Sequence, residues 1–256
     1  TEATVKWLYE GRTSVSNFDP ILETPIDKLK DFLARRDIRR IHALGGRPKI
    51  NSVLDFGAGN GRFSIASRTI FPGCSVDAVD FDPDPPSSLY GLQGIRYLPL
   101  ANFLKTSEQY DLILLRYVLE HVHDPVSLLR TLTHRLSPGG ILYIEVPNID
   151  SAHIYYFGKT VNAFSVPYHL FNFDIPSLKS VIHSAGLNCK ITHKGLPLAG
   201  CVLAALLKQE RSVVHQIAGM ILHPVQLVMD WKHGKYILAA ICQKLHKPET
   251  LVIGEL

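Results

Sequence analysis

Short apolar runs alternate with helical patterns through most of this chain. Runs bounded by glycine, proline, serine or asparagine predict strands, and apolar positions spaced three or four residues apart predict helices. Because strands that alternate with helices pair as βαβ units, we predict an α/β fold with a doubly wound, mainly parallel seven-stranded sheet and helices on both faces. The predicted strands cover residues 52–56, 75–80, 95–98, 111–115, 141–146, 188–193 and 236–243, and the predicted helices between them cover 62–68, 125–136 and 175–185.

Two segments fall outside this alternation. A helix near residues 21–43 precedes the first strand. Before the last strand, residues 196–232 contain two apolar helical stretches, 198–207 and 212–229, and Pro224 is predicted to interrupt the second. We therefore predict a lead-in with a basic helix over residues 1–49 and a main domain over residues 50–256 that contains the insertion. The insertion is predicted to form a substrate lid or a homodimer contact, and its apolar surface leaves a peripheral membrane contact open.

The composition is that of a globular protein. Of the 256 residues, 46% are hydrophobic and 20% are charged, which excludes a disordered chain. The four cysteines form no CxxC pair, which argues against a zinc ribbon, a dithiol redox motif and a disulfide framework and favours a reducing compartment. The chain shows no signal-peptide pattern, and its longest apolar run, Leu196–Leu207, is shorter than the ~18–20 residues of a membrane span. We therefore expect a cytoplasmic protein.

Positive charge is concentrated in one segment of the chain. Residues 28–49 carry eight lysines and arginines against two aspartates, a net +6, so the rest of the chain carries −2 of the overall +4. This segment is interpreted as the solvated face of a helix. A nucleic-acid partner is not favoured, because no recognised nucleic-acid-binding motif accompanies the basic patch.

A glycine-rich loop follows the first predicted strand. Gly57, Gly59 and Gly61 alternate just after Asp55, and the next helix begins with unpaired N–H groups and a positive dipole end. A dinucleotide fingerprint would need its third glycine at position 62, which is an arginine. Asp80 ends the second strand, where a carboxylate can accept hydrogen bonds from both hydroxyls of a ribose. The pattern predicts a nucleotide-like cofactor at this edge of the sheet.

Four sequence blocks occur in order between residues 53 and 148. They read VLDFGAGNGRFS, VDAVDFDP, YDLILLRYVLEHVHDP and LSPGGILYIEVPN. Together they resemble the class I S-adenosylmethionine (SAM)-dependent methyltransferases, in particular the branch with small-molecule, carbohydrate and ubiquinone-pathway O-methyltransferases. A fifth block, YHLFNF at residues 168–173, is similar to that branch as well. The resemblance implies an enzyme that uses SAM as its cofactor.

The resemblance also implies a cofactor site along the ends of the first four strands. The glycine loop would wrap the methionine part of SAM, Asp80 would hold the ribose hydroxyls, and Phe81 and Asp82 would lie beside the adenine. Asn102 would accept a hydrogen bond from the adenine amino group, where the family often has an aspartate. The residues implied in cofactor binding are Asp55, Gly57, Ala58, Gly59, Asn60, Gly61, Asp80, Phe81, Asp82, Ala101, Asn102 and Arg116.

Residues beyond the fourth strand are implied to meet the methyl acceptor. The resemblance places Arg116, Tyr117, Glu120 and His121 on the floor of the site, with Tyr117 among the candidate catalytic residues, and places His169 on its substrate side. Methyl transfer to a hydroxyl requires removal of a proton, so His121 is the first candidate base and His169 the second; a packing role for His121 is the alternative. Some relatives bind a divalent metal through a Glu-x-x-Glu-His block and a distant histidine. Because Tyr117 stands in place of the first acid of that block, we expect no metal.

The predicted activity is O-methylation of a small molecule, a glycan or a lipid-linked acceptor by in-line methyl transfer. An RNA or protein methyltransferase that uses the basic helix is one alternative, and a non-catalytic subunit that binds the cofactor is another. A dehydrogenase is disfavoured by the arginine in the glycine loop.

Overall fold

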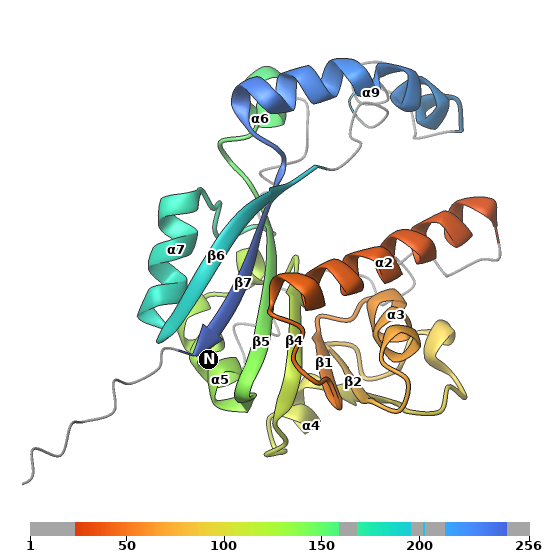
Figure 1. Cartoon of the computed structure of the whole chain (residues 1–256), viewed down its shortest axis with the longest axis vertical. Coiled ribbons are helices and arrows are strands. Elements are labelled where there is room, and N and C mark those ends of the chain that lie inside the picture. Colours follow the sequence, from red (N-terminus) through yellow and green to blue (C-terminus); the bar gives the residue numbers. More distant parts are fainter. Residues whose placement is uncertain (1–23, 159–167, 196–201, 203–212, 245–256) are drawn as a thin grey trace, which may run out of the picture.

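The computed structural model describes residues 24–158, 168–195, 202 and 213–244, in which one seven-stranded sheet carries helices on both faces (Figure 1). The strand order is β3-β2-β1-β4-β5-β7-β6. Neighbouring strands from β3 to β5 pair in parallel, whereas β7 is antiparallel to both β5 and β6. The predicted fold class is confirmed. The strands are β1 (Ser52–Phe56), β2 (Ser75–Asp80), β3 (Ile95–Pro99), β4 (Tyr110–Arg116), β5 (Leu136–Pro147), β6 (Leu187–Lys194) and β7 (Ile237–Lys244).

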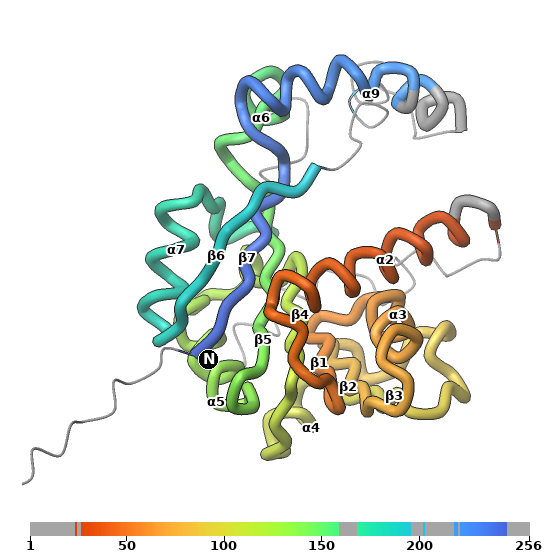
Figure 2. The backbone as a smooth tube through the Cα atoms, in the orientation of Figure 1, coloured from red at the N-terminus to blue at the C-terminus, as the bar shows by residue number. Residues whose placement is uncertain are grey.

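The helices form a layer on each face of the sheet. Alternate residues of β4 point to opposite faces of the sheet. Leu112 and Leu114 pack in the apolar cluster under α2 and α3. Ile113 and Leu115 pack in the cluster under α5 and α7. Figure 2 traces α2 alongside α3. The α-helices are α2 (Pro25–Leu44), α3 (Arg62–Ile70), α4 (Leu100–Phe103), α5 (Pro125–Arg135), α6 (Ala152–Phe157), α7 (Ile175–Ser184) and α9 (Val213–His233), and the 3₁₀ turns are η2 (Ser87–Leu89) and η3 (Leu119–His121).

Some boundaries differ from the sequence prediction. β5 begins at Leu136, where a helix was expected to end, because Leu136 pairs with Tyr110 before a register shift. The short helix α6 was not predicted; the Ser151 hydroxyl caps it by accepting from the Ile154 N–H at 3.4 Å. The predicted helix over residues 198–207 lies, apart from residue 202, outside the described residues.

The polarity of α9 is the reverse of that expected for a surface helix. Its Gln226 and Asp230 side chains are buried, whereas Ile221 is 72% exposed and Trp231 is 88% exposed. The helix also continues through Pro224, which the sequence predicted to interrupt it. None of the helices in the described part of the chain has the length and apolar character needed to cross a bilayer. The lid, dimer and peripheral membrane assignments of the insertion stay predictions.

Helix α2 is held against α3 by Arg62, which follows the glycine loop as the first residue of α3. The Arg62 guanidinium donates to the Asp27 carboxylate at 2.7 Å, to the Asp27 carbonyl at 2.9 Å and to the Asp31 carboxylate. The Arg62 and Asp27 side chains are each about nine-tenths buried. An arginine that sequence reasoning used only to reject a dinucleotide fingerprint therefore positions the lead-in helix beside the cofactor loop.

A buried ion cluster centred on Glu145 joins α2 to three strands. The Glu145 side chain is 0% exposed; it accepts from Arg116 Nε of β4 at 2.7 Å, from Lys194 Nζ of β6 at 2.5 Å and from the Tyr143 hydroxyl. Lys194 Nζ also lies 2.7 Å from the Asp37 carboxylate. Burial alone would raise the pKa of Glu145, but Arg116 and then Lys194 lower it to about 2.

Glu145→Gln should lower the free energy of unfolding by about 3–5 kcal/mol at pH 7, because it removes the buried counter-charge that two largely buried cations share. Since the folded pKa lies below the ~4.3 of an unfolded glutamate, this contribution is present above about pH 4.3 and lost as the pH falls toward 2. Urea unfolding between pH 3 and 7 measures both effects.

Glu108→Gln is the matched control for this prediction. Glu108 also pairs with an arginine, Arg96, but its side chain is 44% exposed. Glu108→Gln should lower the free energy of unfolding by no more than about 1 kcal/mol. Equal destabilisation by the two substitutions would contradict the central place given to Glu145.

Candidate active site

The glycine loop leaves β1 at the carboxyl edge of the sheet and is tied to the end of β2. The N–H groups of Gly57 and Ala58 both donate to the Val79 carbonyl, at 2.8 and 3.0 Å, and the Gly61 N–H donates to the Ala58 carbonyl at 2.9 Å. Gly57 has φ +80°, and a Cβ there would lie 2.3 Å from the Val118 side chain. Glycine at this position therefore lets the loop lie directly against the segment that follows β4.

Asn60 continues the loop into α3. Its side-chain oxygen accepts from the Arg62 N–H at 3.3 Å, and its carbonyl accepts from the Ser88 hydroxyl of η2 at 2.5 Å. Gly59 and Gly61 also have positive φ, at +54° and +73°. The loop is thus held on both sides, and the first turn of α3 points its N–H groups toward the carboxyl edge.

Asp80, at the tip of β2, is oriented by the main chain around it. Its Oδ2 accepts from the Gly59 N–H at 2.7 Å and its Oδ1 accepts from the Phe81 N–H at 2.8 Å. Each carboxylate oxygen can accept a second hydrogen bond. The geometry therefore fits the predicted grip on a ribose, with both oxygens already aligned.

The predicted adenine-side residues lie at the corner between β2 and β3. Asp82 lies two residues after Asp80, and the Asp82 carbonyl accepts from the Tyr97 hydroxyl of β3 at 2.7 Å. Pro99, the register partner of Asp80, leads into α4, where Ala101 and Asn102 are exposed. The structure brings these residues to the same edge as the glycine loop, and their contacts with adenine stay a prediction.

Asp55 lies beneath the loop as a buried carboxyl. Its Oδ2 accepts from the Ser64 hydroxyl at 2.6 Å. Burial raises the pKa of Asp55 to about 6, although the Ser64 hydrogen bond and the charge of Arg116 act in the opposite direction. Sequence reasoning missed Ser64, which lies in the same block, because a serine near the start of a helix is common in any protein.

Arg116 ends β4 beside Asp55, but its guanidinium is engaged by protein groups. It donates to Glu145 and lies 3.4 Å from the centroid of the Phe63 ring. Sequence reasoning predicted Arg116 as a cofactor ligand and did not find Phe63 or Glu145. A glutamate inside an otherwise apolar strand is the signal that could have pointed to a buried ion pair.

Beyond β4, the chain bends so that Tyr117 adopts a left-handed conformation with φ +54°. Its N–H donates to the Glu145 carbonyl at 2.9 Å. Burial raises the pKa of the Tyr117 phenol well above its usual range, so the phenol keeps its proton near neutral pH, and the predicted place of Tyr117 in catalysis stays a prediction.

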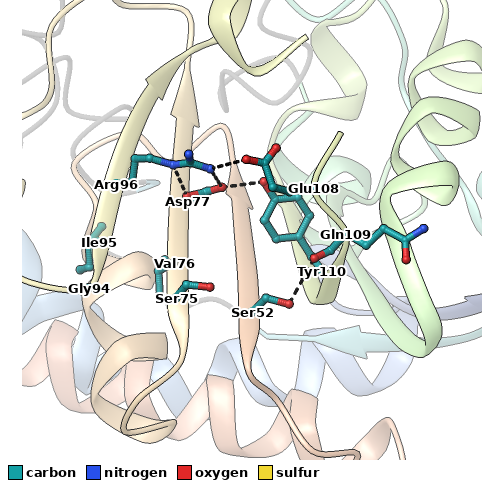
Figure 3. A pocket seen from close by; sticks show the side chains of 10 residues that line it. All are labelled: Ser52, Ser75, Val76, Asp77, Gly94, Ile95, Arg96, Glu108, Gln109 and Tyr110. Atoms are coloured by element: carbon teal, nitrogen blue, oxygen red, sulfur yellow. Dashed lines mark hydrogen bonds and ion pairs between the residues drawn. The ribbon is translucent and has the colours of Figure 1, made fainter. Parts of the chain in front are cut away.

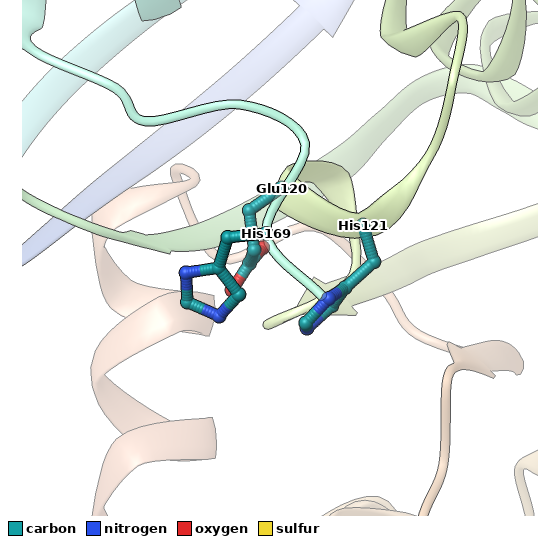
Figure 4. A group of neighbouring side chains, drawn as sticks. All are labelled: Glu120, His121 and His169. Atoms are coloured by element: carbon teal, nitrogen blue, oxygen red, sulfur yellow. The ribbon is translucent and has the colours of Figure 1, made fainter. Parts of the chain in front are cut away.

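Glu120, His121 and His169 converge beside this bend (Figure 4). One ligand atom from each lies within 4.8 Å of the other two, and the two imidazole rings meet edge to face with centroids 4.7 Å apart. The segment that carries His169 is docked on η3 because the N–H groups of Leu170 and Phe171 both donate to the Glu120 carbonyl, at 2.8 and 3.1 Å. The two predicted histidines are therefore brought together, with a buried carboxylate that sequence reasoning treated as a secondary feature.

The hydrogen bond to His121 fixes its tautomer. Nδ1 of His121 lies 2.8 Å from the Tyr168 carbonyl, and a carbonyl can only accept, so Nδ1 carries the proton. In the neutral ring, Nε2 then has the lone pair that a base or a metal ligand needs. One carboxylate and two imidazoles suit a divalent cation such as Mn²⁺ or Zn²⁺, so the donor set fits a metal that the sequence reading did not expect.

A hollow of about 360 Å³ lies at the opposite edge of the sheet (Figure 3). It is lined by residues at the starts of β1, β2, β3 and β4, and the Arg96 guanidinium bridges Asp77 and Glu108 across it. Ligands of open α/β sheets bind at the carboxyl ends of the strands, so this hollow is not part of the candidate site.

Comparison with known proteins agrees with this geometry. A family model described as a methyltransferase domain matches residues 27–191, and the chain belongs to this family of class I SAM-dependent methyltransferases. It is 33% identical to the methyltransferase str2 of Strobilurus tenacellus over 113 residues, which are 43% of this chain and 39% of that protein. It is 27% identical to the ubiquinone biosynthesis O-methyltransferase of Marinobacter nauticus over 153 residues, 54% of this chain and 63% of that one. The chain thus spans less than two thirds of the length of these relatives.

Solved structures share the fold over nearly the whole chain. The plantazolicin methyltransferase BpumL, in complex with S-adenosylhomocysteine (SAH), matches 95% of this chain and 99% of its own with a TM-score of 0.57 at 15% identity. Coclaurine N-methyltransferase bound to N-methylheliamine and SAH matches 94% of this chain and 78% of its own with a TM-score of 0.56 at 14% identity. At these identities the likeness concerns the fold.

Asp80→Asn should weaken SAH binding by at least about tenfold, or ~1.4 kcal/mol, because one of the two aligned carboxylate oxygens becomes a donor. Calorimetric titration of parent and variant measures the effect. Asp84→Asn, an exposed aspartate in the same turn, should bind SAH like the parent. Unchanged affinity in a folded Asp80→Asn protein would contradict the role of Asp80.

SAH affinity should be constant from pH 7 to 8 and fall below about pH 6, because protonated Asp55 no longer attracts the amino group of the methionine part. Titrations in a constant-ionic-strength buffer series measure this. Ser64→Ala removes a hydrogen bond that lowers the pKa of Asp55. The SAH affinity of this variant should therefore begin to fall at a higher pH than that of the parent. Asp55→Asn should bind SAH more weakly than the parent, and its affinity should not fall below pH 6. A parent-like fall in that variant would show that another group is responsible.

Proposed function

We propose that this chain transfers the methyl group of SAM to a hydroxyl oxygen of a small-molecule, glycan or lipid-linked acceptor. The observation that carries the proposal is the convergence of Glu120, His121 and His169 next to Val118, which itself packs against Gly57 of the cofactor loop. Proton-accepting groups thus lie beside the loop that would hold the methyl donor. The name of one relative, a ubiquinone biosynthesis O-methyltransferase, is compatible with a small-molecule acceptor.

The chain's part in the reaction is alignment and proton transfer. The acceptor oxygen attacks the methyl carbon in line with the sulfur, so that an O–C bond forms as the C–S bond breaks and SAH leaves. The hydroxyl proton passes to Nε2 of His121, which the Tyr168 carbonyl keeps in the required tautomer. The His169 ring, which meets the His121 ring edge to face, would orient His121 and the acceptor, and Glu120 would offset the positive charge that forms on the imidazole.

The same three residues would hold a divalent cation if one is used. Such an ion would lower the pKa of an acceptor hydroxyl that approaches it. Without an ion, His121 would instead take up the proton of that hydroxyl. In both cases the acceptor oxygen would be activated by the cluster of Glu120, His121 and His169. The cofactor would be bound by Asp80 and the glycine loop.

SAH release from SAM should be measured against a panel of phenols, catechols and sugars. On the best acceptor, His121→Ala and His169→Ala should lower kcat by about 10²-fold or more, the scale of general-base catalysis, while SAH affinity stays within twofold of the parent. His123→Ala, an exposed neighbour outside the cluster, is the control and should leave kcat unchanged. Treatment with EDTA followed by Mg²⁺, Mn²⁺ or Zn²⁺ separates a metal site from a histidine base.

Two outcomes would overturn the proposal. SAH binding without turnover on any acceptor would support the alternative of a non-catalytic cofactor-binding subunit. Full activity of His121→Ala and His169→Ala on a hydroxyl acceptor would show that the cluster is structural.

A further inference from the structure

Two cysteines face each other across the last pair of strands. Cys189 of β6 and Cys242 of β7 are direct register partners in an antiparallel pair. Opposed residues in such a pair project from the same side of the sheet, with Cα atoms about 4.5–5.5 Å apart. A disulfide spans Cα separations of about 4.4–6.8 Å, so the backbone already has the spacing that the bond needs.

The surroundings of the two thiols differ in a way that favours reaction at Cys189. Cys242 is fully buried in the core under α5 and α7, whereas Cys189 lies at the edge of that core and is half-buried. The facing Cys242 thiol outweighs burial in lowering the pKa of Cys189 to about 7, with a further contribution from Lys179 of α7. Thiolate, the reactive form, is therefore available at neutral pH on the more accessible of the two sulfurs.

Cys74 provides a contrast within the same chain. It is buried in the opposite core cluster, and burial raises its pKa. The fourth cysteine, at position 201, lies outside the described residues.

We propose that Cys189 and Cys242 form a reversible disulfide when the protein meets a low-molecular-weight disulfide such as oxidised glutathione. The Cys189 thiolate attacks one glutathione sulfur, so the glutathione S–S bond breaks and one glutathione thiolate leaves and takes up a proton. Cys242 then attacks the Cys189 sulfur of this mixed disulfide, and its proton goes to the second departing glutathione. Two protein thiols are oxidised, and one glutathione disulfide is reduced to two thiols.

The bond would close a ring from residue 189 to residue 242 that contains α9. It would fix the C-terminal strand β7 to β6, since β7 is inserted between β5 and β6. Cys242 pairs with Leu142 of β5, five residues before the carboxyl end of that strand at Pro147, which is about 17 Å from the edge that carries the candidate active site. We therefore expect the disulfide to stabilise the fold and to leave SAH affinity within twofold.

The test is to equilibrate the folded protein with glutathione at graded ratios of oxidised to reduced form, block the remaining thiols by alkylation and map the peptides without reduction. The expected result is one crosslinked peptide pair joining Cys189 to Cys242, formed also by Cys74→Ser. The Cys242→Ser variant should stop at a glutathione adduct on Cys189, and Cys189→Ser should leave Cys242 unmodified. The oxidised parent should unfold at a Tm several degrees higher, and dithiothreitol should reverse the shift.

Several results would overturn the proposal. They are the absence of the 189–242 crosslink at every ratio, a mixed disulfide on Cys189 that persists in the parent, or modification of Cys74 as fast as Cys189. A crosslink that leaves the Tm unchanged would refute the stabilising role. Because Cys189 is half-buried, Cys189→Ser remains informative even if Cys242→Ser fails to fold.

Discussion

The buried carboxylate of Glu145 fixes the elements around the candidate active site relative to one another. It pairs with Arg116 at the end of β4 and with Lys194 at the end of β6, and Lys194 reaches Asp37 of α2. A buried charge without its partner costs several kcal/mol, so these elements must be in place together. Because Arg116 also stacks on Phe63 at the start of α3, the constraint extends to the helix that follows the glycine loop.

The cofactor half and the acceptor half that we propose for the site are built from different chemical groups. The cofactor half relies on main-chain N–H groups, on glycines that allow close approach, and on Asp80, which those N–H groups orient. The acceptor half relies on side chains of η3 and of the 168–173 segment, which meet through hydrogen bonds to one carbonyl. The acceptor half can therefore vary without disturbing the cofactor half, which is how one fold serves methyltransferases with unrelated acceptors.

The parts that the sequence predicted correctly are those that local pattern determines. Strands covered on both faces need continuous apolar residues, and the glycine loop needs small residues at fixed spacing, so both could be found from sequence alone. The sequence did not predict the Arg62 contacts with α2 or the Glu145 cluster, because their partners are distant in sequence and the same residue types also occur on solvated surfaces. It also predicted an interruption of α9 at Pro224, where the structure keeps one continuous helix.

The docking of residues 168–173 also controls the chemistry of His121. The Tyr168 carbonyl that receives the Nδ1 proton belongs to the same segment that carries His169, and this segment is 47 residues away in the chain. When the segment is docked, His121 has a fixed tautomer, a neighbouring imidazole and a nearby carboxylate. Without docking, the ring has no carbonyl acceptor from this segment to select Nε2 as the basic nitrogen. The interaction that docks this segment is thus the same one that sets the tautomer of the proposed base, so that base has its Nε2 lone pair ready only when the segment that carries His169 is in place.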